Sequence, residues 1–92
     1  MTGYLVTYDL NKQGKDYSGL FAELKKTTRW WKRLDSAWIL VTTETAGQIW
    51  DRIKSHIDKD DYCLIIQVCD SVQGWLPTDD WTWIHANVPS CR

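Results

Sequence analysis

Hydrophobic and polar residues alternate in the first apolar segment of the chain, YLVTYDL at residues 4–10. As a strand, this segment would point Tyr4, Val6, Tyr8 and Leu10 to one side, and Leu5, Thr7 and Asp9 to the other. A polar loop with Gly14 follows. The apolar positions 17, 20, 21 and 24 then recur at helical spacing, which predicts a helix over about 17–28.

The middle of the chain continues with strand and helix patterns. RWWKRL (29–34) and AWILVTT (37–43) consist mainly of β-forming residues and predict two strands joined at Asp35-Ser36. Thr45 and Gln48 have the spacing of a capping box before a second helix, over about 45–57. YCLIIQV (62–68) is nearly all apolar, which is typical of a central strand. The order βαββαβ predicts a ferredoxin-like α/β fold.

The C-terminal region, residues 69–92, is rich in tryptophan and is interrupted by Gly74 and Pro77. WTWIHANV (81–88) alternates well enough to predict one extra C-terminal strand. With both helices on one face, a four-stranded sheet would leave its other face bare. A second copy would be the simplest cover, with its tail strand added to the partner's sheet edge. We therefore expect a single domain, residues 1–92 with a core at 4–68, that forms a homodimer.

Charge and cysteine usage narrow the expected setting. The net charge is −1, but residues 1–40 carry seven Lys/Arg against four Asp/Glu, whereas residues 41–92 carry four against eight. Cys63 and Cys69 would lie about 20 Å apart in one straight strand, too far to pair. We expect reduced thiols in a cytoplasmic protein. No apolar run approaches the roughly 20 residues that span a bilayer, so no membrane partner is expected.

Asp9 is the first candidate site residue, because a carboxylate near the end of an apolar strand is costly unless something pairs with it. In a face-to-face dimer, the two copies of Asp9 would approach each other and could share a Mg²⁺ ion. Such an ion could polarise a phosphodiester and activate water. Alternatively, Asp9 accepts hydrogen bonds from amides of the adjoining loop and starts the turn.

The second candidate is a basic cluster that includes aromatic residues and would suit a nucleic acid. Its cations are Lys25, Lys26, Arg29, Lys32 and Arg33, and Trp30 and Trp31 lie among them. Cations beside an exposed ring match a phosphate backbone with stacked bases, and Trp31 is the ring that we select. The alternative is a solvated helix end and a charged edge strand.

Several motifs together resemble the CRISPR-associated protein two family, and most closely its stand-alone SinR-type and virulence-associated-protein-D-like relatives. These motifs are Tyr8-Asp9-Leu10 at the end of the first strand, LDSAWIL (34–40) and TAGQIWDRIKSHIDKDDYCLIIQV (45–68). The similarity covers residues 4–68, and Trp38 stands where the family often has an aromatic residue.

The resemblance implies a ferredoxin-like homodimer that binds RNA or DNA and, in active members, cleaves it with a metal ion. Asp9 carries over as the catalytic and metal-binding residue, with Mg²⁺ as the expected cofactor, and Ser36 carries over as a second catalytic candidate. The alternative is a catalytically inactive module of a defence or toxin–antitoxin system. There the sheet face and Trp81 and Trp83 would bind a protein partner.

Overall fold

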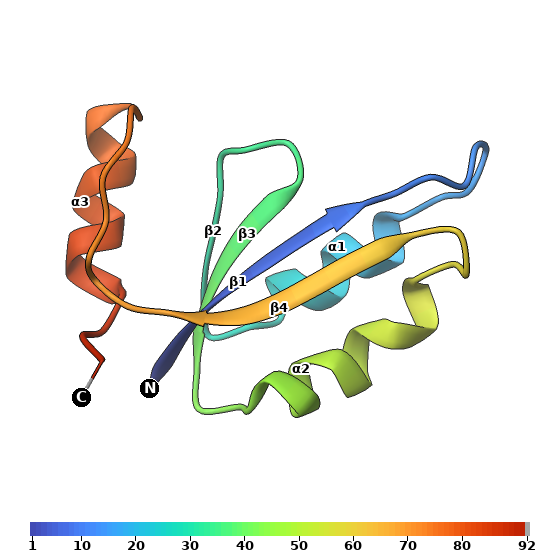
Figure 1. The fold of residues 1–92 in the computed structure, drawn as a ribbon, viewed down its shortest axis with the longest axis horizontal. Helices are drawn as coiled ribbons and strands as arrows, with labels where there is room; N and C mark the ends of the chain where they lie inside the picture. The colour runs from blue at the N-terminus through green and yellow to red at the C-terminus, as the bar shows by residue number, and fades with distance from the viewer. Residues whose placement is uncertain (92) are drawn as a thin grey trace.

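A four-stranded antiparallel sheet and three α-helices make up the computed structural model, which describes residues 1–91 (Figure 1). The elements are β1 (Thr2–Asp9), α1 (Ser18–Lys25), β2 (Arg29–Lys32), β3 (Ala37–Thr42), α2 (Ala46–Ile53), a 3₁₀ turn η1 (Lys54–His56), β4 (Tyr62–Val68) and α3 (Thr78–Asn87). The strand order is β2-β3-β1-β4, and each neighbouring pair is antiparallel. None of the helices in residues 1–91 is both long and apolar enough to cross a membrane.

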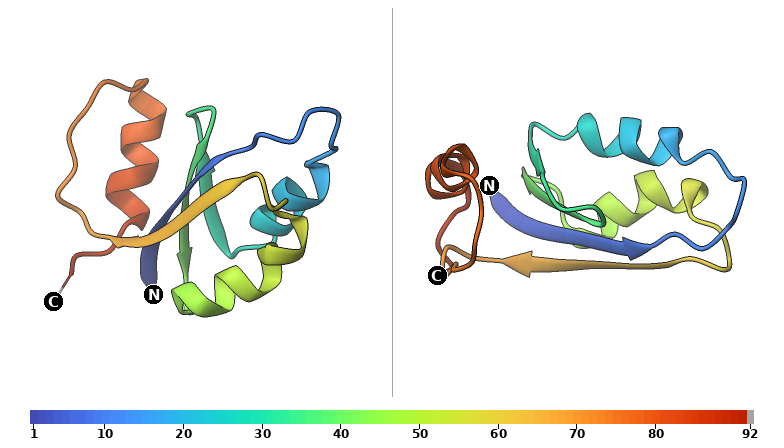
Figure 2. Two further views of the ribbon diagram at one scale, coloured as in Figure 1. Left: turned by 45° about the vertical axis from the view of Figure 1, so that its right-hand side comes forward. Right: turned by 90° about the horizontal axis from the view of Figure 1, so that it is seen from above.

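Helices α1 and α2 lie together on one face of the sheet, which we call the inner face (Figure 2). The predicted alternation of β1 is confirmed, because Tyr4, Val6 and Tyr8 are buried beneath these helices with Leu20 and Ile49. Trp38 of β3 is also buried there, and its indole N–H donates to the Tyr8 hydroxyl oxygen at 2.9 Å. A buried indole that has its hydrogen-bond partner helps to fix β3 beside its neighbour β1 in the sheet.

Capping and one arginine position the two inner helices. The predicted capping box is confirmed, since the Gln48 amide donates to Thr45 Oγ1 and the Thr45 amide donates to Gln48 Oε1. Arg52 of α2 reaches across to α1, where it donates to the Glu23 carbonyl oxygen. It also pairs with Glu44 at 2.8 Å, and this hydrogen bond lowers the pKa of Glu44 below its usual value.

The prediction of a tail strand over 81–88 is wrong, because this segment belongs to helix α3. The acidic residues Asp79 and Asp80 lie in its first turn, where they favour helix formation. Asp80, Ile84 and Val88 follow at a spacing of four and are buried. The Trp31 indole N–H donates to one oxygen of Asp80 at 2.9 Å, and Arg33 Nε donates to the other at 2.8 Å.

Helix α3 therefore covers part of the second face of the sheet, which we call the outer face (Figure 1). A second apolar cluster forms there around Trp31, Ile84 and Val88, and Ile39 of β3 packs against it. The expectation of a wholly bare face closed by a partner's tail strand is thus wrong. The part that stays open is on β4, where Tyr62, Leu64 and Ile66 are 73%, 54% and 48% exposed. We call these three residues the β4 patch.

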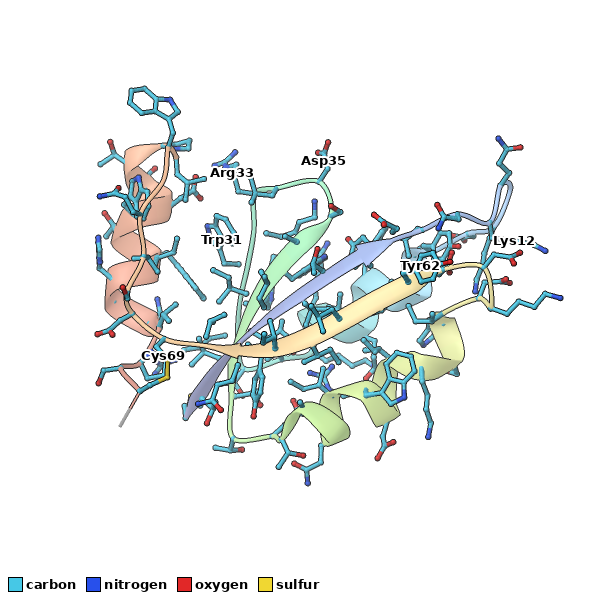
Figure 3. The ribbon with its side chains drawn as sticks, in the orientation of Figure 1. Lys12, Trp31, Arg33, Asp35, Tyr62 and Cys69 are labelled. Atoms are coloured by element: carbon cyan, nitrogen blue, oxygen red, sulfur yellow. A yellow bond between two sulfur atoms is a disulfide. The ribbon has the colours of Figure 1, made fainter. Side chains whose placement is uncertain are left out.

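The expectation of reduced thiols is also wrong for two of the cysteines. Cys69, just after β4, forms a disulfide with Cys91, and their Cα atoms are 5.3 Å apart. Cys63 and Cys69 do not pair, as the strand spacing predicts, but the chain returns after α3 to the end of β4 and brings Cys91 to Cys69 (Figure 3). Cys63 is free and half-buried, and burial raises the pKa of its thiol, which disfavours the reactive thiolate.

We predict that the disulfide stabilises the docking of α3. A closed loop of this size restricts the unfolded chain by about 3 kcal/mol in the chain-entropy estimate. Urea denaturation of the protein should therefore show a lower midpoint with dithiothreitol than without it. The Cys69→Ser/Cys91→Ser variant should have the same urea midpoint as the reduced protein, and dithiothreitol should not change that midpoint. Equal midpoints for the oxidised and reduced wild type would contradict this role.

Candidate functional site

Asp9 is the last residue of β1, and it lies on the outer face, opposite Tyr62 of β4. It is exposed and borders a hollow of about 210 Å³ whose other walls include Thr7, Tyr62 and Leu64. Among residues 1–91, no hydrogen bond or ion pair reaches its carboxylate, and only its main-chain carbonyl accepts a bond, from Asn11 at 3.4 Å. The carboxylate is therefore available to a ligand.

The alternative role for Asp9, accepting amide hydrogen bonds in the adjoining loop, is wrong, because Asp61 accepts these hydrogen bonds instead. The Asn11 amide donates to Asp61 Oδ1 at 2.7 Å, and the Asp58 amide donates to Oδ2 at 2.8 Å. The Tyr17 hydroxyl also donates to Asp61, at 2.7 Å. One buried carboxylate thus joins the loop after β1, the start of α1 and the turn before β4.

The pKa values of this cluster follow from the same contacts. Burial alone would raise the pKa of Asp61, but the bonds from Asn11, Tyr17 and Asp58 outweigh it and lower the pKa. Burial, with the hydrogen bond to Asp61, raises the pKa of Tyr17. All the donors around Asp61 belong to the fold itself, so we assign it a structural role.

Ser36, the second catalytic candidate, lies at the same end of the sheet as Asp9. It is exposed in the turn before β3. Its carbonyl oxygen accepts bonds from the Tyr8 amide at 3.1 Å and from Thr7 Oγ1 at 2.9 Å. These bonds hold the turn against the last residues of β1, and they leave the Ser36 hydroxyl uncommitted within residues 1–91.

The basic cluster is divided between two faces, because β2 alternates. Arg29, Trp31 and Arg33 point to the outer face, where Arg29 donates to Asn87 of α3 at 3.4 Å. Trp31 is only 7% exposed, so it presents no free ring face to a base, which the prediction for Trp31 required. Lys26 is exposed on α1 and pairs with Glu23 at 3.1 Å.

The remaining members of the cluster meet on the inner side of β2. Here a cleft of about 540 Å³ opens between α1 and the β2–β3 turn. It is lined by Phe21, Lys25, Trp30, Lys32, Asp35 and Trp38. Trp30 is 38% exposed, and the Lys25 ammonium lies 5.7 Å from its ring centroid. Both lysines belong to the predicted basic cluster, but the exposed ring beside them is that of Trp30, and the prediction for Trp31 is wrong.

Residues 1–91 contain no group of three or more His, Cys, Asp or Glu side chains placed to hold an ion. Asp9 offers one carboxylate per chain. Because Mg²⁺ is commonly held by one or two carboxylates plus waters and substrate phosphates, this donor fits the ion when two copies contribute it.

Comparisons with known proteins found no matching family model, no matching curated protein and no matching solved structure.

We predict that Asp61→Asn lowers the thermal midpoint and loosens the loop after β1, whereas Asp60→Asn, its exposed neighbour, does not. The pKa of Asp61 in the folded protein lies below its ordinary 3.8. Its stabilising effect is thus complete above that pH and is lost as the pH falls through the folded-state value. Urea denaturation of both variants and the wild type between pH 7 and pH 2 measures this. A gap between wild type and Asp61→Asn that stays constant down to pH 2 would refute the assignment.

Proposed function

We propose that this chain forms a homodimer that binds and cleaves nucleic acid, with Mg²⁺ held by the Asp9 carboxylates of both copies. The observation that carries the proposal is the exposed Asp9 carboxylate, which has no partner within residues 1–91. A carboxylate that is not used by the fold, at the end of a strand that is mostly buried, is a candidate ligand. Its place in Tyr8-Asp9-Leu10 also matches the family that the sequence resembles.

A ferredoxin-like assignment of the fold belongs to the same proposal. It is supported by the element order βαββαβ before α3 and by the antiparallel strand order β2-β3-β1-β4. In such a sheet, β1 lies between β3 and β4 and ends beside the exposed edge strand. This topology carries no activity by itself, so the proposed chemistry depends on Asp9 and Ser36.

The β4 patch is the surface that we assign to the second copy. Three outward apolar side chains on an edge strand, with unpaired backbone beside them, invite association with another strand or sheet. A twofold axis through this surface would bring the same patch of both copies together. Because Asp9 is paired in register with Tyr62 of the patch, the two Asp9 carboxylates would lie near that axis.

The chemistry proposed for the site uses few groups. Two carboxylates brought together repel each other, and a bound cation removes this repulsion. A divalent ion would supply a Lewis acid for a phosphate oxygen and a more acidic water. Asp9 would hold that ion, and the Ser36 hydroxyl, next to the end of β1, would donate to the substrate phosphate.

A protein-interaction module is the second candidate, and one observation favours it. Trp75, in the segment between β4 and α3, is 98% exposed, and the β4 patch is also open. Trp81 and Trp83, which the sequence suggested for this role, are partly buried against the outer-face cluster. A protein partner would therefore contact Trp75 before it could contact either of them.

The test of catalysis is the Asp9→Asn variant. If Asp9 holds the metal, Mg²⁺-dependent cleavage of mixed RNA and DNA should fall by at least about 100-fold, since the ion contributes several kcal/mol to the barrier. The control is Asp70→Asn, another exposed aspartate just after a strand, which should cleave like the wild type. Equal cleavage by the wild type and Asp9→Asn would exclude Asp9 from the mechanism.

The test of the dimer is a charge placed in the β4 patch. Wild-type protein should give twice the 10.8 kDa chain mass in light scattering, and Leu64→Lys should give the single-chain mass. Trp75→Lys, which also replaces an exposed apolar side chain, should stay dimeric. A wild type that remains at 10.8 kDa at high concentration would refute the dimer.

A further inference from the structure

The cleft between α1 and the β2–β3 turn has a fixed aromatic wall. Trp38 is 2% exposed and hydrogen-bonded to Tyr8, so its ring cannot turn freely. Phe21 stacks on Trp38, with ring centroids 6.2 Å apart and an interplanar angle of 20°. Trp30 also lies against the Trp38 ring, with centroids 5.4 Å apart and an interplanar angle of 47°. Trp30 is therefore supported from behind and still leaves ring surface open to solvent.

Polar groups around this wall carry mainly positive charge. Lys25 of α1, Lys32 of β2 and Asp35 line the cleft. Asp35 lies in the β2–β3 turn (Figure 3). The Trp30 indole N–H donates to no atom of residues 1–91, in contrast to the indoles of Trp31 and Trp38. The cleft thus combines a stacking surface, two cations and one unused donor.

We propose that this cleft binds one nucleotide unit of a single-stranded nucleic acid. The base stacks on Trp30, and Lys25 and Lys32 contact the adjoining phosphates. This inference rests on the proposed function, and it supplies the nucleic-acid contact that the buried Trp31 does not. The cleft volume of about 540 Å³ falls within the range of ordinary ligand pockets.

A base can replace the lysine that now lies over Trp30. An exposed cation–π contact changes an equilibrium by about two- to fivefold, whereas stacking of one base changes affinity by about five- to 150-fold. The exchange therefore favours the base, and the displaced Lys25 ammonium stays near enough to contact a phosphate. Single strands are favoured over duplexes because paired bases keep their faces covered by neighbours.

The test measures binding of the full chain to a fluorescently labelled ten-nucleotide strand by anisotropy, in RNA and DNA arms of the same sequence, without divalent metal. Trp30→Ala should weaken binding by about five- to 150-fold, and Trp30→Phe by less, since phenylalanine keeps a ring against Trp38. The matched control is Trp50→Ala on α2, because Trp50 is 39% exposed, nearly the same as Trp30. Its affinity should change by less than about twofold.

The charged groups give a second, independent readout. The slope of log affinity against log salt concentration should become less steep by about 1.4 in the Lys25→Ala/Lys32→Ala variant. This is the value expected for the loss of two single-strand phosphate contacts. Lys54→Ala, which replaces an exposed lysine at the end of α2 that does not line the cleft, should leave this dependence unchanged. Asp35→Asn should tighten binding, because it removes a negative charge from the rim.

Several results would overturn the inference. These are equal losses for Trp30→Ala and Trp50→Ala, equal competition by a duplex of the same sequence, binding of a free mononucleotide as tight as that of the strand, and no binding by the wild type.

Asp9→Asn separates the two proposals, since it should bind strands normally while losing cleavage. Strand binding without any metal-dependent cleavage would reject the catalytic proposal and keep the cleft. Normal cleavage and binding by Trp30→Ala would reject the cleft alone.

Discussion

The alternation of the edge strand β2 is the constraint on which the rest of this structure depends. Trp30 and Trp31 are adjacent, so a strand must send them to opposite faces. Trp31 becomes buried, and a buried indole N–H that lacks a partner is costly. Asp80 of α3 accepts that hydrogen, and Arg33 compensates the buried charge that Asp80 brings. These two contacts hold α3 on the outer face and leave Trp30 on the inner side.

The position of α3 determines which surfaces remain for function. The helix covers the outer face near β2 and β3, so the apolar surface of β4 and the adjoining Asp9 stay open. Asp9 and the Trp30 cleft consequently lie on opposite faces of the sheet. The β2–β3 turn connects them, since Asp35 lines the cleft and Ser36 is bonded to the end of β1.

The sequence predicted the bounds of elements that carry strong local signals. β4 matches its predicted range, 62–68, and the Thr45–Gln48 capping box starts α2 as expected. The position of β4 in the sheet was not predicted, because its apolar run is typical of a central strand and β4 is an edge strand with exposed apolar side chains. The prediction of a tail strand was wrong because Trp81 and Trp83 alternate with polar residues, as in a strand. The buried face of helix α3 includes Asp80, which a hydrophobic pattern counts as polar. Asp80 is buried only because of Trp31 and Arg33, which lie 49 and 47 residues away in sequence. The disulfide was missed for a related reason, since it depends on the path of the chain around α3.

The two carboxylates near the loop after β1 show how the structure separates a folding role from a free group. The sequence suggested Asp9 as a possible acceptor for the loop amides. The structure gives all of those donors to Asp61, which is buried and whose pKa is lowered by them. Asp9 then makes no side-chain contact that the fold requires within residues 1–91. Replacing Asp9 should therefore leave stability nearly unchanged, so any loss of activity in that variant can be attributed to the site itself rather than to unfolding.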